Sequence, residues 1–228
     1  MAVAGPFPMD VLLRPWRYWG GGAPWGVVWL GLLAGSIALS VLAAQHDRLP
    51  GDLDLTQRLQ DSVFPGLRLS KFVRLVTTTQ VVLGTGGAVA VALWLFGRRR
   101  QAVLLVVGLA AMALLQTGVK ELVDRPRPTP DLVEVRAGFS SPSFPAGHVM
   151  GPTLLYGFLV YLAMALKLPL AVRIAVLGGS AFVLVLTGPA NVYMGVHWPS
   201  DVVGGYAWGA VLVLPLVYAD RMLAGRYP

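Results

Sequence analysis

Six apolar segments, each close to the length of a membrane-crossing helix, limit the folds open to this chain. They run approximately over residues 26–44, 74–96, 101–119, 149–166, 172–188 and 202–219. A helix needs about 20 apolar residues to cross a bilayer, and lipid cannot satisfy open backbone groups, so helices are the default. Only 13% of the 228 residues are charged, about half the share of a soluble domain. The sequence predicts an all-α integral membrane protein whose residues 1–228 form a single bundle of six transmembrane helices.

Two segments outside these runs have a different character. Residues 1–25 contain Trp16, Tyr18, Trp19 and Trp25 with Arg14 and Arg17, and they lack a basic cluster followed by an apolar core. This pattern is typical of an interfacial anchor and not of a cleavable signal. Residues 45–73 are too polar to span, but Leu55, Leu59 and Val63 recur at helical spacing. We expect a short surface helix between spans 1 and 2, ended by Pro65 and Gly66.

The distribution of positive charge predicts the topology. Six spans put both termini on one side, and Lys and Arg divide nine to nine between the two sides. Arg98–Arg100 in the shortest loop assigns the side of the termini to the cytoplasm. Residues 45–73, 120–148 and 189–201 then face outward together. The abundance of arginine over lysine and of alanine, valine and glycine is typical of a GC-rich bacterial genome, so we expect the membrane to be a bacterial cytoplasmic membrane.

Charge and cysteine content exclude some functions. The net charge is +7, but the arginines are dispersed at the ends of apolar runs. This pattern favours lipid head groups and an anionic substrate as partners over nucleic acid. The absence of cysteine excludes disulfides and thiolate metal sites.

Three polar motifs fall on the expected outer side, and each has two interpretations. In the first, Lys120 ends span 3, and Arg125 and Arg127 each precede a proline. Arginine on a stiff, extended segment suits bidentate binding of phosphate. The alternative is a set of basic anchors at the membrane surface.

The second motif opens span 4. Pro145 fits the first helical position, and Gly147 allows close approach of a ligand to the backbone. His148 then lies at a helix N-terminus, where free N–H groups and the helix dipole attract anions. The alternative is an interfacial or packing histidine.

The third motif opens span 6. Pro199 suits the first helical turn and places Asp201 in it, within reach of His197 four residues earlier. A carboxylate on one imidazole nitrogen fixes the tautomer and leaves the other nitrogen free to attack. The alternative is a helix-capping aspartate beside an interfacial histidine and tryptophan.

Together the three motifs resemble the signature of the type 2 phosphatidic acid phosphatase (PAP2) family of membrane lipid phosphatases, which are related to vanadium haloperoxidases. Lys120 is followed after six residues by Arg127–Pro128, Pro145–His148 forms the second part, and His197 is followed after three residues by Asp201. The match covers about half the chain.

The resemblance implies a role for each matching residue. His197 would be the nucleophile and form a phosphohistidine, Asp201 would orient it, and His148 would protonate the leaving group. The phosphoryl oxygens would be held by Lys120, Arg127 and the backbone of Gly147. This scheme requires no metal or other cofactor.

Two parts of the signature differ in this chain. The family has serine where this chain has Ala146, and a Ser-Arg pair where it has Ala190 and Asn191. Asparagine brings neither charge nor a bidentate fork. We expect a weakened or retuned site in which Arg125 partly substitutes, and we expect Asn191→Arg to raise activity. Ala146, Asn191 and Arg125 remain candidate phosphate-binding positions.

The predicted function is hydrolysis of a phosphomonoester or pyrophosphate on a membrane lipid at the extracytoplasmic face. Phosphatidic acid, phosphatidylglycerol phosphate and polyprenyl pyrophosphate are the candidate substrates. The alternative is a catalytically impaired protein that binds or transports lipid phosphates on the same scaffold. A small-solute transporter would need charges deep within its spans, and spans 1, 2, 5 and 6 have almost none.

Overall fold

The computed structural model describes residues 22–224, and within this range every regular element is an α-helix, as the sequence predicts. The predicted anchor over residues 1–25 lies almost entirely outside the described residues. The helices are α2 (Gly22–Gln45), α3 (Asp52–Asp61), α4 (Leu67–Val76), α5 (Thr79–Leu95), α6 (Arg99–Val123), α7 (Gly147–Ala165), α8 (Leu170–Tyr193) and α9 (Pro199–Ala224).

Five of these helices are long and apolar enough to cross a membrane: α2, α6, α7, α8 and α9. A sixth candidate is the pair formed by α4 and α5, which meet at a bend of 51°. The predicted span over residues 74–96 is therefore not one straight helix. Thr78 causes the break, because its hydroxyl accepts from the N–H of Val81 at 3.3 Å and caps α5.

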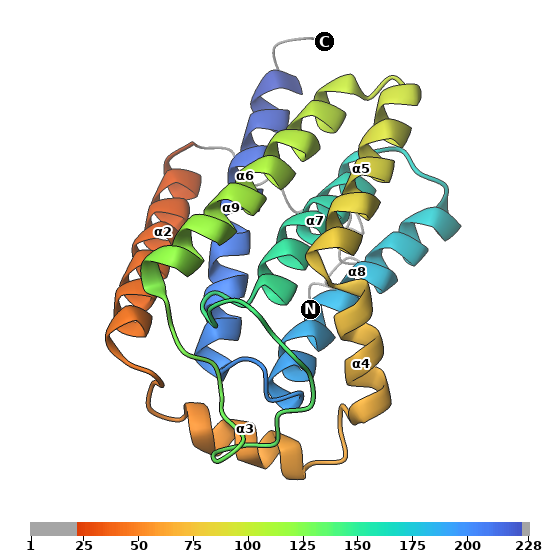
Figure 1. The fold of residues 1–228 in the computed structure, drawn as a ribbon. Helices are drawn as coiled ribbons and strands as arrows, with labels where there is room; N and C mark the ends of the chain where they lie inside the picture. The colour runs from red at the N-terminus through yellow and green to blue at the C-terminus, as the bar shows by residue number, and fades with distance from the viewer. Residues whose placement is uncertain (1–21, 225–228) are drawn as a thin grey trace, which may run out of the picture.

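The bundle is built around α7, which packs against both α8 and α9 (Figure 1). Small residues on α9 allow the close approach. A Cβ on Gly209 would come within 2.5 Å of Thr153, and one on Gly205 within 2.7 Å of the carbonyl oxygen of Ala146. Glycines four residues apart on one helix face let two backbones pack closely where lipid supplies no hydrophobic drive.

Helix α8 extends further than the sequence predicts. Its apolar run was expected to end at residue 188, yet the helix continues through Pro189 to Tyr193. Proline removes only one backbone donor, and the amide of Asn191 donates to the carbonyl of Thr187 one turn earlier at 2.7 Å. Asn191 consequently lies on a helix and not in a loop.

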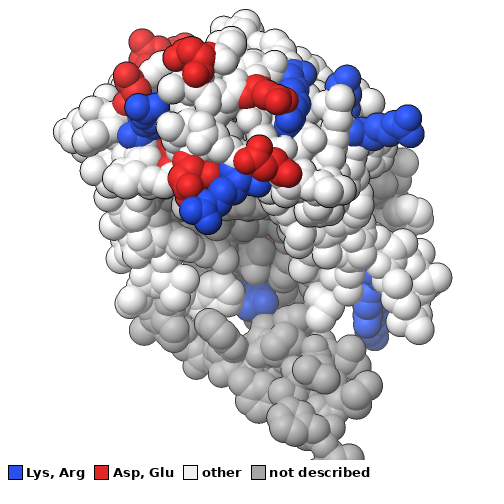
Figure 2. All heavy atoms as spheres, turned by 90° about the horizontal axis from the view of Figure 1, so that it is seen from below, with Lys and Arg blue, Asp and Glu red and all other residues white. Residues whose placement is uncertain are grey.

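The polar segments gather at one end of the bundle. Helix α3 crosses this lower end, beside the long connection from α6 to α7 (Figure 1). Acidic and basic side chains are interspersed over the same end when it is viewed from below (Figure 2). Helix α3 corresponds to the short helix predicted within residues 45–73. The last part of that segment, residues 67–73, belongs to α4.

Candidate active site

His197 lies between the end of α8 and the start of α9 and has 1% of its surface exposed. Its Nδ1 is 3.7 Å from Oδ2 of Asp201, in the first turn of α9. Its Nε2 is 3.2 Å from Nη1 of Arg127. Because an arginine can only donate, this contact makes Nε2 the acceptor and leaves the proton on Nδ1, toward Asp201. The imidazole therefore has an orienting carboxylate on one side and a lone pair directed at a cation on the other.

Asp201 is fully buried and accepts hydrogen bonds from three donors, while Nδ1 of His197 stands 3.7 Å away. The hydroxyl of Ser143 donates to it, the N–H of Trp198 does so at 2.8 Å, and Nη1 of Arg125 does so at 2.6 Å. Its position at the N-terminus of α9 also favours a negative charge. The carboxylate is thus fixed and ionised before any ligand binds.

Arg127 reaches the site from the extended segment that follows α6. Its Nε donates to the carbonyl of Ser141 at 2.7 Å, and Nη1 donates to the carbonyl of Val196 at 2.6 Å. Burial lowers the pKa of Arg127 to about 10, Asp201 opposes this effect, and the charge of Arg74 adds to it. The guanidinium remains charged at neutral pH.

Lys120 and His148 are the other two side chains of the expected set. Lys120 is buried in the last turn of α6 and donates to the carbonyl of Pro142. His148 is the second residue of α7 and interacts electrostatically with His197, Lys120 and Arg127. Among residues 22–224, no backbone or side-chain acceptor pairs with the N–H groups of Gly147 or His148, as expected for a first helical turn.

Arg125 takes a different place from the one expected for it. It has 1% of its surface exposed, and its guanidinium forms ion pairs with Asp52 at 3.0 Å and Asp201 at 2.6 Å. It also donates to Ser200 and to the carbonyl of His46. Because these partners surround the guanidinium, Arg125 is not available to bind a phosphate as the sequence analysis expected.

Ala146 is not available to bind phosphate either. Its side chain is buried in an apolar cluster with Val149, Val192 and Val202. The N–H of Ala146 donates to the carbonyl of Asp201 at 3.1 Å. Ala146 is the N-cap residue of α7, so Pro145 precedes the helix and is not its first residue as predicted. Position 146 offers neither a hydroxyl nor an available N–H to a ligand.

The sequence analysis missed two residues near the site. Arg74 of α4 donates from Nη1 to Oδ1 of Asn191 at 2.5 Å. Gln116 lies one turn before Lys120 on α6, and its amide would be 2.9 Å from a Cβ on Gly147. The Gln116–Lys120 spacing of four residues within an apolar run was a usable signal, whereas nothing near Arg74 in the sequence points to position 191.

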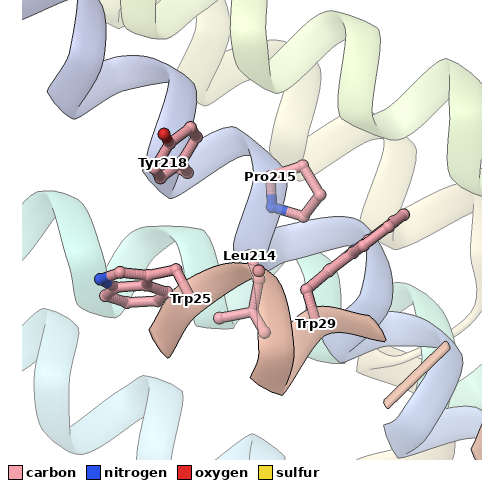
Figure 3. Close-up of a pocket in the computed structure, with 6 residues that line it drawn as sticks. Trp25, Trp29, Leu214, Pro215 and Tyr218 are labelled. Atoms are coloured by element: carbon pink, nitrogen blue, oxygen red, sulfur yellow. The ribbon is translucent and has the colours of Figure 1, made fainter. Parts of the chain in front are cut away.

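An apolar groove lies at the opposite end of the bundle. It has a volume of about 350 Å³ and lies between α2 and α9, lined by Trp25, Gly26, Trp29, Leu214, Pro215 and Tyr218 (Figure 3). Fourteen residues of helix separate Pro215 from Asp201, which is about 21 Å. The groove contains no charged lining residue, so it offers no cation to a phosphate.

The lower end brings the buried imidazole of His197 together with a carboxylate and an arginine, and comparisons with known proteins identify the family of the chain. The PAP2 superfamily profile matches residues 101–223. Phosphatidylglycerophosphatase B of Bacillus subtilis (strain 168) is 29% identical over 138 residues, which are 58% of this chain and 61% of that protein. The crystal structure of a transmembrane PAP2-type phosphatidylglycerolphosphate phosphatase from Bacillus subtilis superposes with a TM-score of 0.61 at 20% identity, covering 88% of this chain and 96% of that one.

The chain belongs to the PAP2 superfamily, which confirms the resemblance read from its motifs. It is an integral membrane protein, because its apolar helices share the fold of a transmembrane relative. The matched segment begins in α6 and ends in α9, so it contains every signature position but excludes α2 to α5.

Proposed function

We propose that this protein hydrolyses a phosphate ester or pyrophosphate on a membrane lipid through a phosphohistidine. The observation that carries the proposal is the arrangement of His197, with Nδ1 toward Asp201 and Nε2 toward Arg127. Membership of the PAP2 superfamily supports the same reaction.

The reaction has two balanced steps. The lone pair of His197 Nε2 attacks phosphorus, the bond from phosphorus to the lipid oxygen breaks, and His148 gives its proton to that oxygen. The incoming phosphate anion favours the protonated imidazole needed for this step. His148 next takes a proton from water, the resulting hydroxide attacks phosphorus, and the P–N bond breaks to release inorganic phosphate. Lys120 and Arg127 stabilise charge on the equatorial oxygens, and the scheme uses no metal.

The position of the charges favours this reaction over transport. In the described membrane-spanning helices, every charged residue stands within five residues of a helix end. A solute pathway calls for ionisable groups near the middle of the spans. A lipid can instead remain in the bilayer and present its head group at the lower end.

Phosphate release from a short-chain lipid tests the function. Purified protein in detergent is given dioctanoyl phosphatidic acid, the matching phosphatidylglycerol phosphate and a short polyprenyl pyrophosphate. The name of the curated relative makes phosphatidylglycerol phosphate the first substrate to test. We expect His197→Ala to abolish release, because no other nucleophile stands in its place.

The third histidine supplies the matched control. His46 is exposed, and its ring contacts only the carbonyl of Leu42 among the described residues. His46→Ala should therefore retain wild-type release. Binding of all three lipids without release by the wild-type protein would instead support the binding or transport alternative.

A further inference from the structure

We propose that Arg74 of α4 supplies the phosphate-binding positive charge that the family signature places at position 191. This inference rests on the proposed function and adds a ligand-binding residue to it. The two positions are 117 residues apart in the chain and meet only in the folded protein.

Asn191 is placed to accept a hydrogen bond from an arginine and so to fix its position. It is fully buried, and its Nδ2 donates to the carbonyl of Thr187 at 2.7 Å. That bond directs Oδ1 the other way, where it accepts from Nη1 of Arg74 at 2.5 Å. An arginine at 191 could not do this, because a guanidinium has no acceptor. The substitution that removes the charge from α8 therefore creates the contact that fixes a charge from α4.

The charge of Arg74 lies close enough to the catalytic groups to act on them. It interacts electrostatically with His148 and with Arg127. Thr187, which accepts from Asn191, donates its own hydroxyl to the carbonyl of His148. Among the described residues, Asn191 is the only hydrogen-bond partner of the Arg74 guanidinium, so four of its five N–H groups remain for phosphoryl oxygens.

The packing of α4 also explains why alanine stands at position 190, where the family signature has serine. Ala190 is fully buried against Val73 and Leu186, with Leu69 beside them. Position 190 thus forms part of the contact between α8 and α4, where a small apolar side chain is required. The bend after Val76 lets α4 lie along α8 while α5 turns away toward α6. Ala190 and Asn191 thus both lie where α8 contacts α4.

A charge-relocation experiment tests the inference. We compare Arg74→Gln, Asn191→Arg and the double variant for kcat/KM, for inhibition by inorganic phosphate and for melting temperature in detergent. An arginine contact to phosphate contributes about 1.5–3 kcal/mol, or about 10- to 150-fold in rate. Arg74→Gln should lose that factor in kcat/KM and weaken inhibition by phosphate about tenfold or more.

Asn191→Arg alone should lower kcat/KM, because it removes the acceptor of Arg74 and sets two guanidinium groups side by side. The structure thus predicts a loss of activity for Asn191→Arg, whereas the sequence alone predicted a gain. In the double variant the charge returns to α8, and kcat/KM should recover about tenfold over Arg74→Gln alone. Arg68→Gln is the matched control, since Arg68 is an exposed arginine on the same helix, and it should change nothing.

Two results would overturn the assignment: activity of Arg74→Gln within about threefold of wild type, or a loss accompanied by unchanged phosphate inhibition and no recovery in the double variant. Phosphate binding to His197→Ala protein, which cannot turn over, separates this inference from the proposed function. If Arg74→Gln weakens that binding, Arg74 holds phosphate even where hydrolysis is absent. If wild type releases no phosphate and Arg74→Gln leaves binding unchanged, both fail.

Discussion

His197 is almost enclosed by protein, and this enclosure determines how it responds to pH. Burial lowers the pKa of His197 to about 3, although the nearby carboxylate of Asp201 acts in the opposite direction and the charge of Arg127 adds to the lowering. The free imidazole has a pKa of about 6.5. A neutral ring at every physiological pH is what a nucleophile with a free Nε2 lone pair requires.

The depressed pKa predicts that folding stability falls with acidity. Below about pH 6.5 the unfolded chain takes up a proton at His197 that the folded chain excludes, and this continues down to about pH 3. The cost is about 1.4 kcal/mol per pH unit. Between about pH 7.5 and pH 5.5, His197→Asn should lose about 1 kcal/mol less stability than wild type, measured by unfolding in detergent. Parallel losses in the two proteins would contradict the pKa of this residue.

The sequence predicts some residues of the site better than others, for a physical reason. His148, Lys120, Arg127, Asp201 and His197 stand at fixed spacings beside helix ends, so local patterns reveal them. The apolar runs reveal the helices because lipid leaves the backbone no other regular structure.

Other features depend on tertiary contacts that no local pattern encodes. Arg74 matters only because α4 bends away from α5 and packs on α8, and Arg125 is excluded only because Asp52 and Asp201 enclose it. Helix α8 passes Pro189 because its last turn is held by its neighbours. These are contacts over long sequence separations, and one chain read alone does not reveal them.

At the scale of the element, α3 acts as a brace on the catalytic end. Its first residue, Asp52, accepts from Arg125 at 3.0 Å and from the N–H and hydroxyl of Ser200 at 2.9 and 2.6 Å. Arg125 in turn binds Asp201, which faces the nucleophile. The short polar helix is thereby joined to the first turn of α9 through buried ion pairs.

Removing this brace should cost stability. Asp52→Asn leaves the guanidinium of Arg125 buried with one charged partner fewer, a loss of about 3 kcal/mol by analogy with other broken buried pairs. Asp54→Asn on the same helix is the matched control, because Asp54 forms only an exposed pair with Arg58, worth about 0.5 kcal/mol or less. Chemical unfolding in detergent compares the two, and equal losses would show that the brace contributes nothing.

At the scale of the whole molecule, the two ends of the bundle carry different polar groups. The lower end holds the candidate site. At the upper end Asp220 of α9 accepts from Arg100 at 2.6 Å, from Gln101 at 3.3 Å and from Tyr161 at 2.7 Å. This cluster joins α6, α7 and α9 on the side we propose to be cytoplasmic.

The absence of cysteine allows a direct test of that orientation. Val63 and Phe96 are 97% and 83% exposed. Val63 lies in the connection from α3 to α4, which is at the lower end, and Phe96 caps the end of α5 that meets α6 at the upper end (Figure 1). A membrane-impermeant maleimide applied to intact cells should label Val63→Cys and leave Phe96→Cys unlabelled until the membrane is opened. The reverse pattern would place the candidate site in the cytoplasm.

The contact between Arg74 and Asn191 also bears on what counts as the smallest working unit of this protein. A truncated chain beginning at α6 would keep every residue of the family signature and could still insert as a bundle. It would nevertheless lack one of the cations around the phosphate, because that cation is encoded 27 residues before the matched segment starts. Truncations, chimaeras and grafted motifs drawn from this protein should therefore begin before α4.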